Sequence, residues 1–148
     1  CSSDLRGREP FAGSSDLAAL ISSIVPFIPG KTTGHPAKRV FQALRIEVNG
    51  ELEILEDAIP AAVDALNLGG RILVMSYHSL EDGIVKKALV ADATSKAPLE
   101  MPIELPEHAP ILRILTKGTQ GASDSEKLAN PRAASVRMRA AEKIREAA

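Results

Sequence analysis

Cysteine is almost absent from this chain, and no hydrophobic run is long enough to cross a membrane. The single cysteine is Cys1, which excludes an internal disulfide framework. No apolar run approaches the roughly 20 residues that a membrane-spanning helix needs, and no basic leader precedes a hydrophobic segment. These absences favour a soluble, cytoplasmic protein that has no membrane partner. A lipoprotein domain anchored through Cys1 is an alternative that the residues leave open.

Net charge is also close to zero, but the charges are unevenly distributed. The chain carries 18 Lys and Arg against 19 Asp and Glu, which gives −1. Basic residues gather at 31–45, and an acidic stretch runs from Glu47 to Asp64. A second basic region, here called the C-terminal basic tail, contains Lys127, Arg132, Arg137, Arg139, Lys143 and Arg145. Such regions are typical either of solvated faces or of a local nucleic-acid footprint.

Most catalytic signatures are missing as well. The chain contains no G-x-G-x-x-G, no Walker lysine loop and no G-x-S-x-G. The three histidines, His35, His78 and His108, are far apart in the sequence and have no neighbouring cysteine, so we expect no zinc or other metal site.

The stretch that most resembles a site is RILVMSYHSLEDGIVKK at 71–87. Its continuous apolar run from Ile72 to Met75 predicts a strand buried on both faces of a parallel sheet. A helix should begin at once, with Ser79 as its N-cap and Asp82 in the capping-box position. Ligands bind at the carboxyl ends of such strands, so Tyr77, His78 and Ser79 should face a substrate crevice. The alternative for His78 is that it only caps or braces the turn.

Helical periodicity predicts two helices before this strand. Ser14 or Ser15 should cap the first, which prolines at 26 and 29 end. Pro36 should begin a long second helix, with apolar positions as far as Ile59 and a kink or restart at Pro60. A polar stripe on this helix contains Lys38, Gln42, Arg45 and Asn49. The stripe is either a solvated flank or a surface that faces RNA.

The remainder of the chain predicts two more strands. After a helix that ends near Asp92, prolines punctuate a long surface loop up to Pro110. Strands are expected at 111–117 and 135–144, joined by a connection in which Ser123 begins a capping box and Asn130-Pro131 stops a helix. These strands should pair antiparallel at the edge of the sheet, where the polar face of the second strand fits.

Three stretches of the chain carry a resemblance to a known family. They are HPAKRVFQALRIEVNGELEIL at 35–55, GGRILVMSYHSLEDGIVKK at 69–87 and NPRAASVRMRAAEKI at 130–144. In this order they resemble the C-terminal half of the RsmH (MraW) family, S-adenosylmethionine-dependent methyltransferases that act on the exocyclic N4 of a cytidine in small-subunit (16S) ribosomal RNA. The family more often has Phe at Tyr77, Arg at Gly83 and a basic residue near Ala134.

The resemblance implies a fold and a division of labour. It implies an α/β fold: a partial doubly wound, methyltransferase-like (Rossmann-type) sheet of about three strands, preceded by helices from an inserted helical domain. Residues 1–34 would be the end of that inserted domain with a disordered start, and 35–148 the C-terminal part of the methyltransferase domain. No stretch resembles the family's cofactor loop or its acidic motif. S-adenosylmethionine should therefore be held by the missing N-terminal half, and this chain alone should bind none and be inactive.

The resemblance also implies roles for single residues. His78 is the catalytic candidate, either orienting the nucleotide or accepting a proton, and ribosomal RNA of the small subunit is the expected partner. The candidate substrate-binding residues are Lys38, Arg39, Gln42, Arg45, Tyr77 and Ser79. The raw sheet edge should pair with the N-terminal half or make a homo-oligomer. The alternative function is a non-catalytic RNA-binding or assembly module that keeps only the substrate side.

Overall fold

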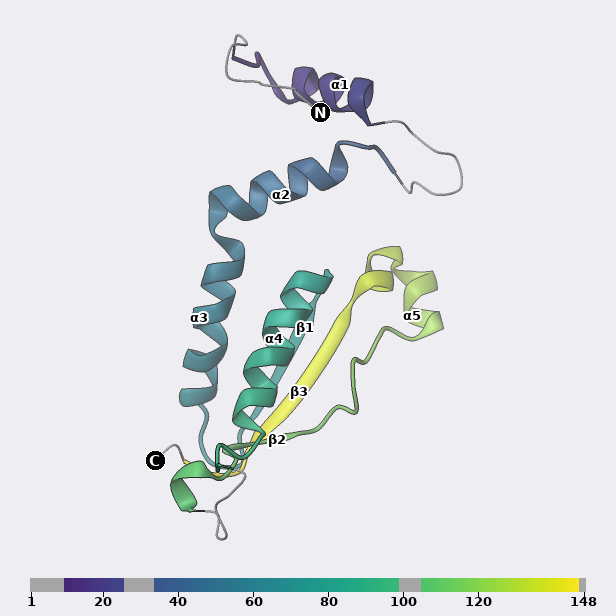
Figure 1. The fold of residues 1–148 in the computed structure, drawn as a ribbon. Helices are drawn as coiled ribbons and strands as arrows, with labels where there is room; N and C mark the ends of the chain where they lie inside the picture. The colour runs from purple at the N-terminus through teal and green to yellow at the C-terminus, as the bar shows by residue number, and fades with distance from the viewer. Residues whose placement is uncertain (1–9, 26–33, 99–104, 147–148) are drawn as a thin grey trace. The chain divides into compact units, whose positions relative to one another are not determined.

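The computed structural model describes residues 10–25, 34–98 and 105–146, which form two compact units. The first unit is Cys1–Asn49 and the second is Gly50–Ala148 (Figure 1). Cys1, the prolines at 26 and 29, and residues 99–104 of the predicted loop lie outside the described residues.

The first unit contains two helices, as predicted. Helix α1 covers Ser14–Ile24 and α2 covers Lys38–Asn49. The predicted serine cap of α1 is wrong, because Gly13 takes the N-cap position and no side chain caps the helix. Ser14 is already the first residue of the helix, so the N-cap position falls on Gly13.

The long helix predicted from Pro36 onward is broken at Gly50 rather than at Pro60. Gly50 has φ 60° and ψ 31°, the left-handed conformation that glycine adopts without a steric cost. Helix α3 then runs over Glu51–Asp64 with Pro60 inside it. Because Pro60 and Glu56 are exposed, the Glu56 carbonyl, which loses its helical donor there, can bind water instead.

The second unit contains a three-stranded sheet in the order β1-β3-β2. Strand β1 covers Arg71–Ser76, β2 covers Leu112–Ile114 and β3 covers Arg137–Lys143. β3 is antiparallel to both neighbours, so β1 and β2 run parallel to each other. The antiparallel pairing of β2 with β3 confirms the prediction, but β3 is the central strand and β2 lies at the edge. The sheet and the helices that precede it confirm the predicted partial α/β fold.

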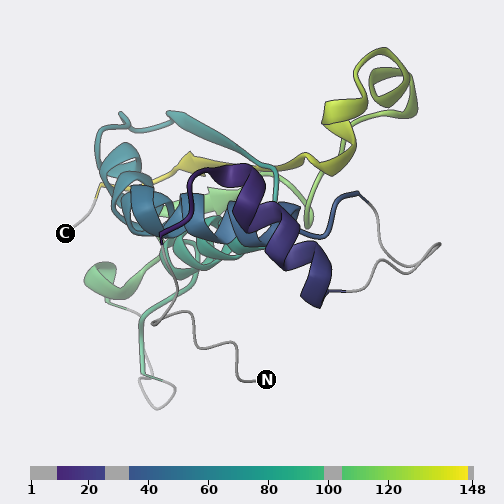
Figure 2. The same ribbon diagram turned by 90° about the horizontal axis from the view of Figure 1, so that it is seen from above.

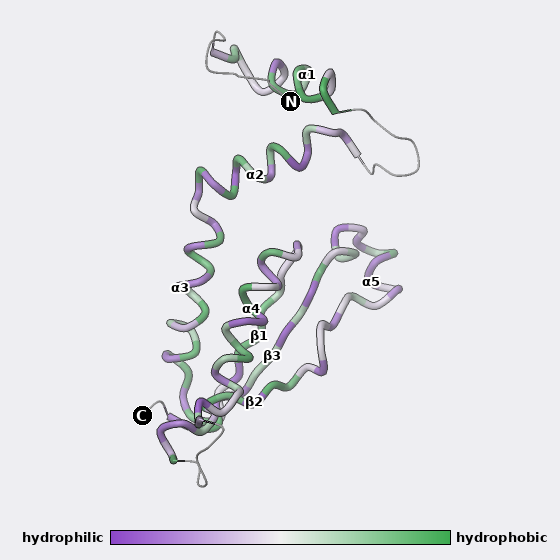
Figure 3. The backbone as a smooth tube through the Cα atoms, viewed as in Figure 1, coloured by the Kyte–Doolittle hydropathy of each residue, from purple (hydrophilic) through white to green (hydrophobic). Residues whose placement is uncertain are grey.

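β1 is covered on only one face, which corrects the expectation of burial on both. Ile72 and Val74 pack against the core, whereas the alternate residues Leu73 and Met75 are 56% and 58% exposed. Its described neighbour is antiparallel β3, and no described strand pairs with its other edge. The apolar run is uniform because Leu73 and Met75 on the outer face are apolar like Ile72 and Val74 on the inner one. Figure 3 colours the backbone by the hydropathy of each residue.

Helix α4 covers Ser79–Asp92 and packs between the sheet and α3 (Figure 2). The buried core draws on both helices and the sheet, and its residues are Ile59, Val63, Val85, Leu89, Leu112 and Ala141. Lys143, at the end of β3, is also buried, and its Nζ donates to the carbonyls of Asp64 and Leu66 at 3.3 and 2.9 Å. A cation thus meets the carbonyl end of α3, where the helix dipole is negative.

The connection between β2 and β3 forms as predicted. Ser123 caps α5, which covers Asp124–Ala129, by accepting from the N–H of Glu126 at 3.2 Å. Asn130 ends α5 and caps the 3-10 helix η3 at Pro131–Ser135. A further 3-10 helix, η2, covers Pro106–His108. Among the described residues, no helix is long and apolar enough to cross a membrane.

Candidate functional site

The carboxyl end of β1 turns directly into α4, and the turn is held by a reciprocal cap. His78 is the N-cap, with an extended backbone, and its Nδ1 accepts from the N–H of Glu81 at 3.4 Å. Glu81 reaches back, and its Oε2 accepts from the N–H groups of Tyr77 at 2.8 Å and His78 at 3.2 Å. The predicted capping pair of Ser79 and Asp82 is therefore shifted by one residue. Glutamate reaches back over three residues better than the shorter aspartate does.

This cap limits what the imidazole of His78 can do. Because Nδ1 accepts from a backbone N–H, the neutral ring carries its hydrogen on Nε2. Nε2 is buried and lies 3.1 Å from Glu81 Oε1, but without the geometry of a hydrogen bond to any described residue. In this arrangement Nε2 is enclosed beside Glu81, and the ring has no free lone pair with which to accept a proton. The geometry thus does not suit proton removal by His78.

Tyr77 and Ser79 flank His78 and point into open space. Tyr77 is 56% exposed, and Ser79 and the neighbouring Leu80 are exposed as well. Tyr77 immediately follows Ser76, which is buried at the end of β1. An exposed aromatic ring beside a strand end is available for stacking.

A buried ion-pair cluster lies immediately behind the elbow. Asp82 accepts from Arg139 through both oxygens, at 2.7 Å from Nε and 3.0 Å from Nη2, and from Arg137 Nη1 at 3.4 Å. Hydrogen bonds from Arg139 lower the pKa of the Asp82 carboxyl, against burial, which raises it. Arg139 also donates to Thr119 Oγ1 at 2.8 Å. The cluster fixes the first turn of α4 to the start of β3.

Sequence reasoning missed this cluster because it assigned Asp82 to the cap. A signal was nevertheless present. Arg137 and Arg139 are two residues apart on a strand, so both side chains lie on one face. A cation on the part of the sheet that a helix covers needs a compensating charge, so an acid on the covering helix is expected.

The remaining predicted residues lie on α2, in the first unit. Lys38, Arg39 and Arg45 are exposed, and Gln42 is half-buried. The structure brings Tyr77, His78 and Ser79 together at the elbow and places the α2 residues on one helix.

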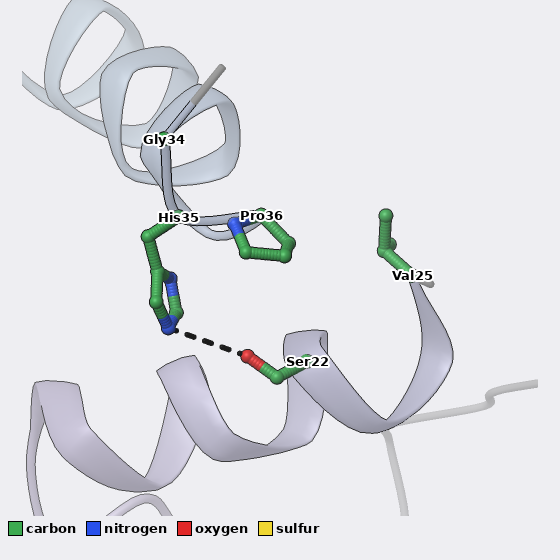
Figure 4. A pocket seen from close by; sticks show the side chains of 5 residues that line it. All are labelled: Ser22, Val25, Gly34, His35 and Pro36. Carbon is green, nitrogen blue, oxygen red and sulfur yellow. Dashed lines mark hydrogen bonds between the residues drawn. The ribbon is translucent and has the colours of Figure 1, made fainter. Parts of the chain in front are cut away.

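The first unit also contains an open pocket of about 390 Å³, lined by Ser22, Val25, Gly34, His35 and Pro36 (Figure 4). His35 Nε2 lies 3.4 Å from Ser22 Oγ, while Nδ1 accepts from the N–H of Ala37 at 3.2 Å. Nε2 must then carry the hydrogen and donate to the serine oxygen, whose own hydrogen goes to the carbonyl of Ala18. The pair is therefore no nucleophile and base, because the histidine cannot take the serine proton.

No described residues form a cluster that could hold a metal ion. They do not fit a nucleoside cofactor at the elbow either. Both elbow N–H groups are already taken by Glu81, and the four described glycines with positive φ lie elsewhere, at 34, 50, 69 and 118.

Comparison with known proteins finds one family that matches nearly the whole chain. The model of the MraW methylase family matches residues 3–144. A relative from Saccharopolyspora erythraea, named Ribosomal RNA small subunit methyltransferase H, is 58% identical over 142 residues, covering 96% of this chain and 43% of the relative. Proteins of the same name from Pseudarthrobacter chlorophenolicus and Nocardia farcinica are 61% and 54% identical, over 95% and 94% of this chain and 42% and 43% of their own lengths. The chain thus spans about two fifths of the relatives that it matches.

Proposed function

Because this chain belongs to the MraW methylase family, we propose that it is the substrate side of an S-adenosylmethionine-dependent methyltransferase that modifies the exocyclic N4 of a cytidine in small-subunit ribosomal RNA. The observation that carries the proposal is the family match over residues 3–144. The names of the relatives support ribosomal RNA as the substrate class. Such an enzyme would work in the cytoplasm, where that RNA is found.

The reaction explains why a substrate side is needed. The cytosine amine is a poor nucleophile because its lone pair is delocalised into the ring, so the amine must be held in line with the methyl group that it receives. The base must also be unstacked from its neighbours and read at its edge. Positioning of the base is the part of this work that the described residues suit.

At the elbow, Tyr77 supplies an exposed ring on which a base can stack. His78 would orient the nucleotide through the exposed part of its ring, and Ser79 offers a hydroxyl beside it. On α2, Lys38, Arg39, Gln42 and Arg45 would contact the RNA backbone. The capping geometry supports orientation rather than proton removal as the role of His78.

The described residues suit the RNA substrate but do not fit the methyl donor. S-adenosylmethionine would supply the methyl group, and we assign its binding to the part of the longer protein that this chain does not match. The chain alone should then be inactive. Titration calorimetry of the 148-residue chain with S-adenosylmethionine should show no heat of binding, and a clear isotherm would overturn this assignment.

A chimera tests the proposed activity. It joins the part of the Saccharopolyspora erythraea relative that precedes the matched region to this chain, and the 58% identity favours correct docking of the two parts. The chimera should transfer a labelled methyl group from S-adenosylmethionine to small ribosomal subunits, and nucleoside mass spectrometry should identify the product as N4-methylcytidine. A folded chimera, shown by cooperative thermal unfolding, that transfers no methyl group would overturn the proposal.

The alternative, a non-catalytic RNA-binding or assembly module, is favoured by the misfit of the donor to the described residues. It predicts that this chain binds RNA in a salt-sensitive way and that an Arg39→Ala, Arg45→Ala double variant binds more weakly. Methyl transfer by the chimera would decide against it.

A further inference from the structure

The C-terminal basic tail is not one continuous charged surface, because the fold assigns its side chains to different tasks. Arg139 and Lys143 are enclosed by Asp82 and by backbone carbonyls, respectively. Lys127 pairs with Asp124 at 3.1 Å, and Arg145 donates to the carbonyl of Pro106 at 3.0 Å. What the tail offers to a ligand is therefore decided by Arg132 and Arg137.

Arg137 lies at the elbow and keeps most of its hydrogen-bonding capacity. It stands opposite Ser76 in the register of β1 with β3, one residue before Tyr77. Its side chain is 45% exposed, whereas that of Arg139 is 14% exposed. Within the described part of the chain only one of its donors is engaged, by a contact of 3.4 Å to Asp82, which leaves the other N–H groups of the guanidinium available.

The charges at this point do not cancel. Asp82 carries one negative charge, and its two oxygens already receive the short bonds from Arg139. Arg137 therefore adds a positive charge that Asp82 does not neutralise. The other nearby acid, Glu81, is directed at the backbone N–H groups of Tyr77 and His78.

Arg132 adds a second cation at the same end of the sheet. It belongs to η3, which ends at Ser135, two residues before β3 begins. The side chain of Asn130 holds the backbone of this turn by accepting from the N–H of Arg132 at 3.1 Å. The guanidinium of Arg132 is exposed and has no ion pair or hydrogen bond with any residue in the described part of the chain.

We propose that Arg137 and Arg132 bind phosphates of a single-stranded RNA segment whose base stacks on Tyr77. Guanidinium groups match phosphate oxygens in a two-pronged geometry. An exposed aromatic ring beside such cations is the combination by which single-stranded RNA is held, since the base takes the ring and the backbone takes the charge. An acidic protein segment would satisfy the arginines but would make no use of the ring.

This inference rests on the proposed function, because it names how the substrate of that site is held. The inference is tested on this chain alone, whereas the proposed function is tested on the chimera. Each can therefore fail without the other. Binding of a fluorescent 12-nucleotide single-stranded RNA is followed by anisotropy between about 50 and 300 mM salt. Each arginine should contribute one phosphate contact, so Arg137→Gln and Arg132→Gln should each weaken binding roughly fivefold at low salt and lower the slope of log K against log salt by about 0.7.

Arg71→Gln is the matched control, because Arg71 is an exposed arginine at the opposite end of β1, paired with Glu142. It should bind RNA as the unsubstituted chain does. Thermal unfolding checks each variant, and Arg132→Gln removes no described contact of the fold, so its result stands even where Arg137→Gln loses stability.

Three outcomes would overturn the inference. They are RNA binding equal to that of the control in both variants, absence of salt-dependent binding by the unsubstituted chain, and equal competition by polyglutamate, which would indicate an acidic protein partner instead. None of these outcomes bears on methyl transfer by the chimera.

Discussion

Asp82 on α4 and Arg139 on β3 form a two-pronged ion pair that fixes the helix to the sheet. Both carboxylate oxygens are bound, at 2.7 and 3.0 Å, and both side chains are nearly enclosed. Water screens such a pair far less than an exposed one. The loss of either member leaves the other charge buried without its partner, and that cost exceeds the net stabilisation from the intact pair.

Asp82→Asn should therefore lower the free energy of unfolding by about 2–4 kcal/mol. The amide keeps the size of the side chain and removes the charge that compensates Arg139. Urea unfolding followed by circular dichroism measures the change. Asp57→Asn on the exposed surface of α3 is the matched control and should stay within about 0.5 kcal/mol of the parent. Equal stability of the two variants would contradict the role given to the ion pair.

The same pair predicts a pH dependence. The pKa of Asp82 is lowered in the folded state, chiefly by hydrogen bonds from Arg139. Its stabilisation is therefore complete above the pKa of an unfolded aspartate, about 3.9, and is lost as the pH falls through the lower folded value. The difference in stability between the parent and Asp82→Asn should be constant from about pH 5 to pH 7 and shrink below about pH 4. A difference that grows on acidification would refute this assignment.

His78 combines a structural task with the functional one proposed for it, and two substitutions separate them. His78→Ala should cost about 1 kcal/mol through loss of the N-cap, whereas asparagine is itself a favourable N-cap and should leave stability nearly unchanged. In the chimera, both variants should lose methyl transfer. Full transfer by His78→Asn would show that the histidine serves only as a cap.

Two glycines should respond to alanine with opposite signs. Gly50 has a positive φ, so Gly50→Ala should destabilise the chain by about 1 kcal/mol. Gly83 lies inside α4, and a Cβ added there meets no atom within 4 Å, so Gly83→Ala should stabilise the chain by about 0.5–1 kcal/mol. Thermal unfolding of the two variants side by side gives the comparison. A loss of stability in Gly83→Ala would mean that α4 needs the glycine for another reason.

Lys143→Met tests the buried lysine. The side chain keeps its length but no longer binds the carbonyls of Asp64 and Leu66, which should cost about 1–3 kcal/mol. Lys117→Met, at an exposed position with no hydrogen bond or ion pair to a described residue, should change stability by less than about 0.5 kcal/mol. Chemical denaturation measures both. Stabilisation by Lys143→Met would show that desolvation of the ammonium outweighs its bonds.

The sequence predicts elements that depend on local signals. The apolar run after Arg71, the Ser123 cap and the stop at Asn130-Pro131 all appear where they were expected, because each depends on residues only a few positions apart. The break at Gly50 was missed for a related reason. Proline was given more weight than glycine, although exposed backbone around Pro60 tolerates the lost hydrogen bond.

Features that depend on distant residues were not predictable in the same way. Whether Asp82 caps its helix or binds Arg139 is settled by where β3 lies, 57 residues later in the chain. Likewise, Leu73 and Met75 are as apolar as a core strand requires, and nothing within the run shows that only one of its faces is covered here. The elbow was located correctly, but its hydrogen bonding, and with it the protonation of His78, required the three-dimensional arrangement.

The strand order β1-β3-β2 has a consequence for how the chain folds during synthesis. β3 is the last of the three strands to be made, yet it supplies every strand-to-strand pairing in the sheet. While residues 137–143 are still inside the ribosome, β1 and β2 have no described strand to pair with, and the core positions Leu112 and Val85 lack their central layer. Among the described strands, the sheet of the second unit can therefore form only when residues 137–143 are present, and a chain truncated before Arg137 should leave β1 and β2 without this central partner.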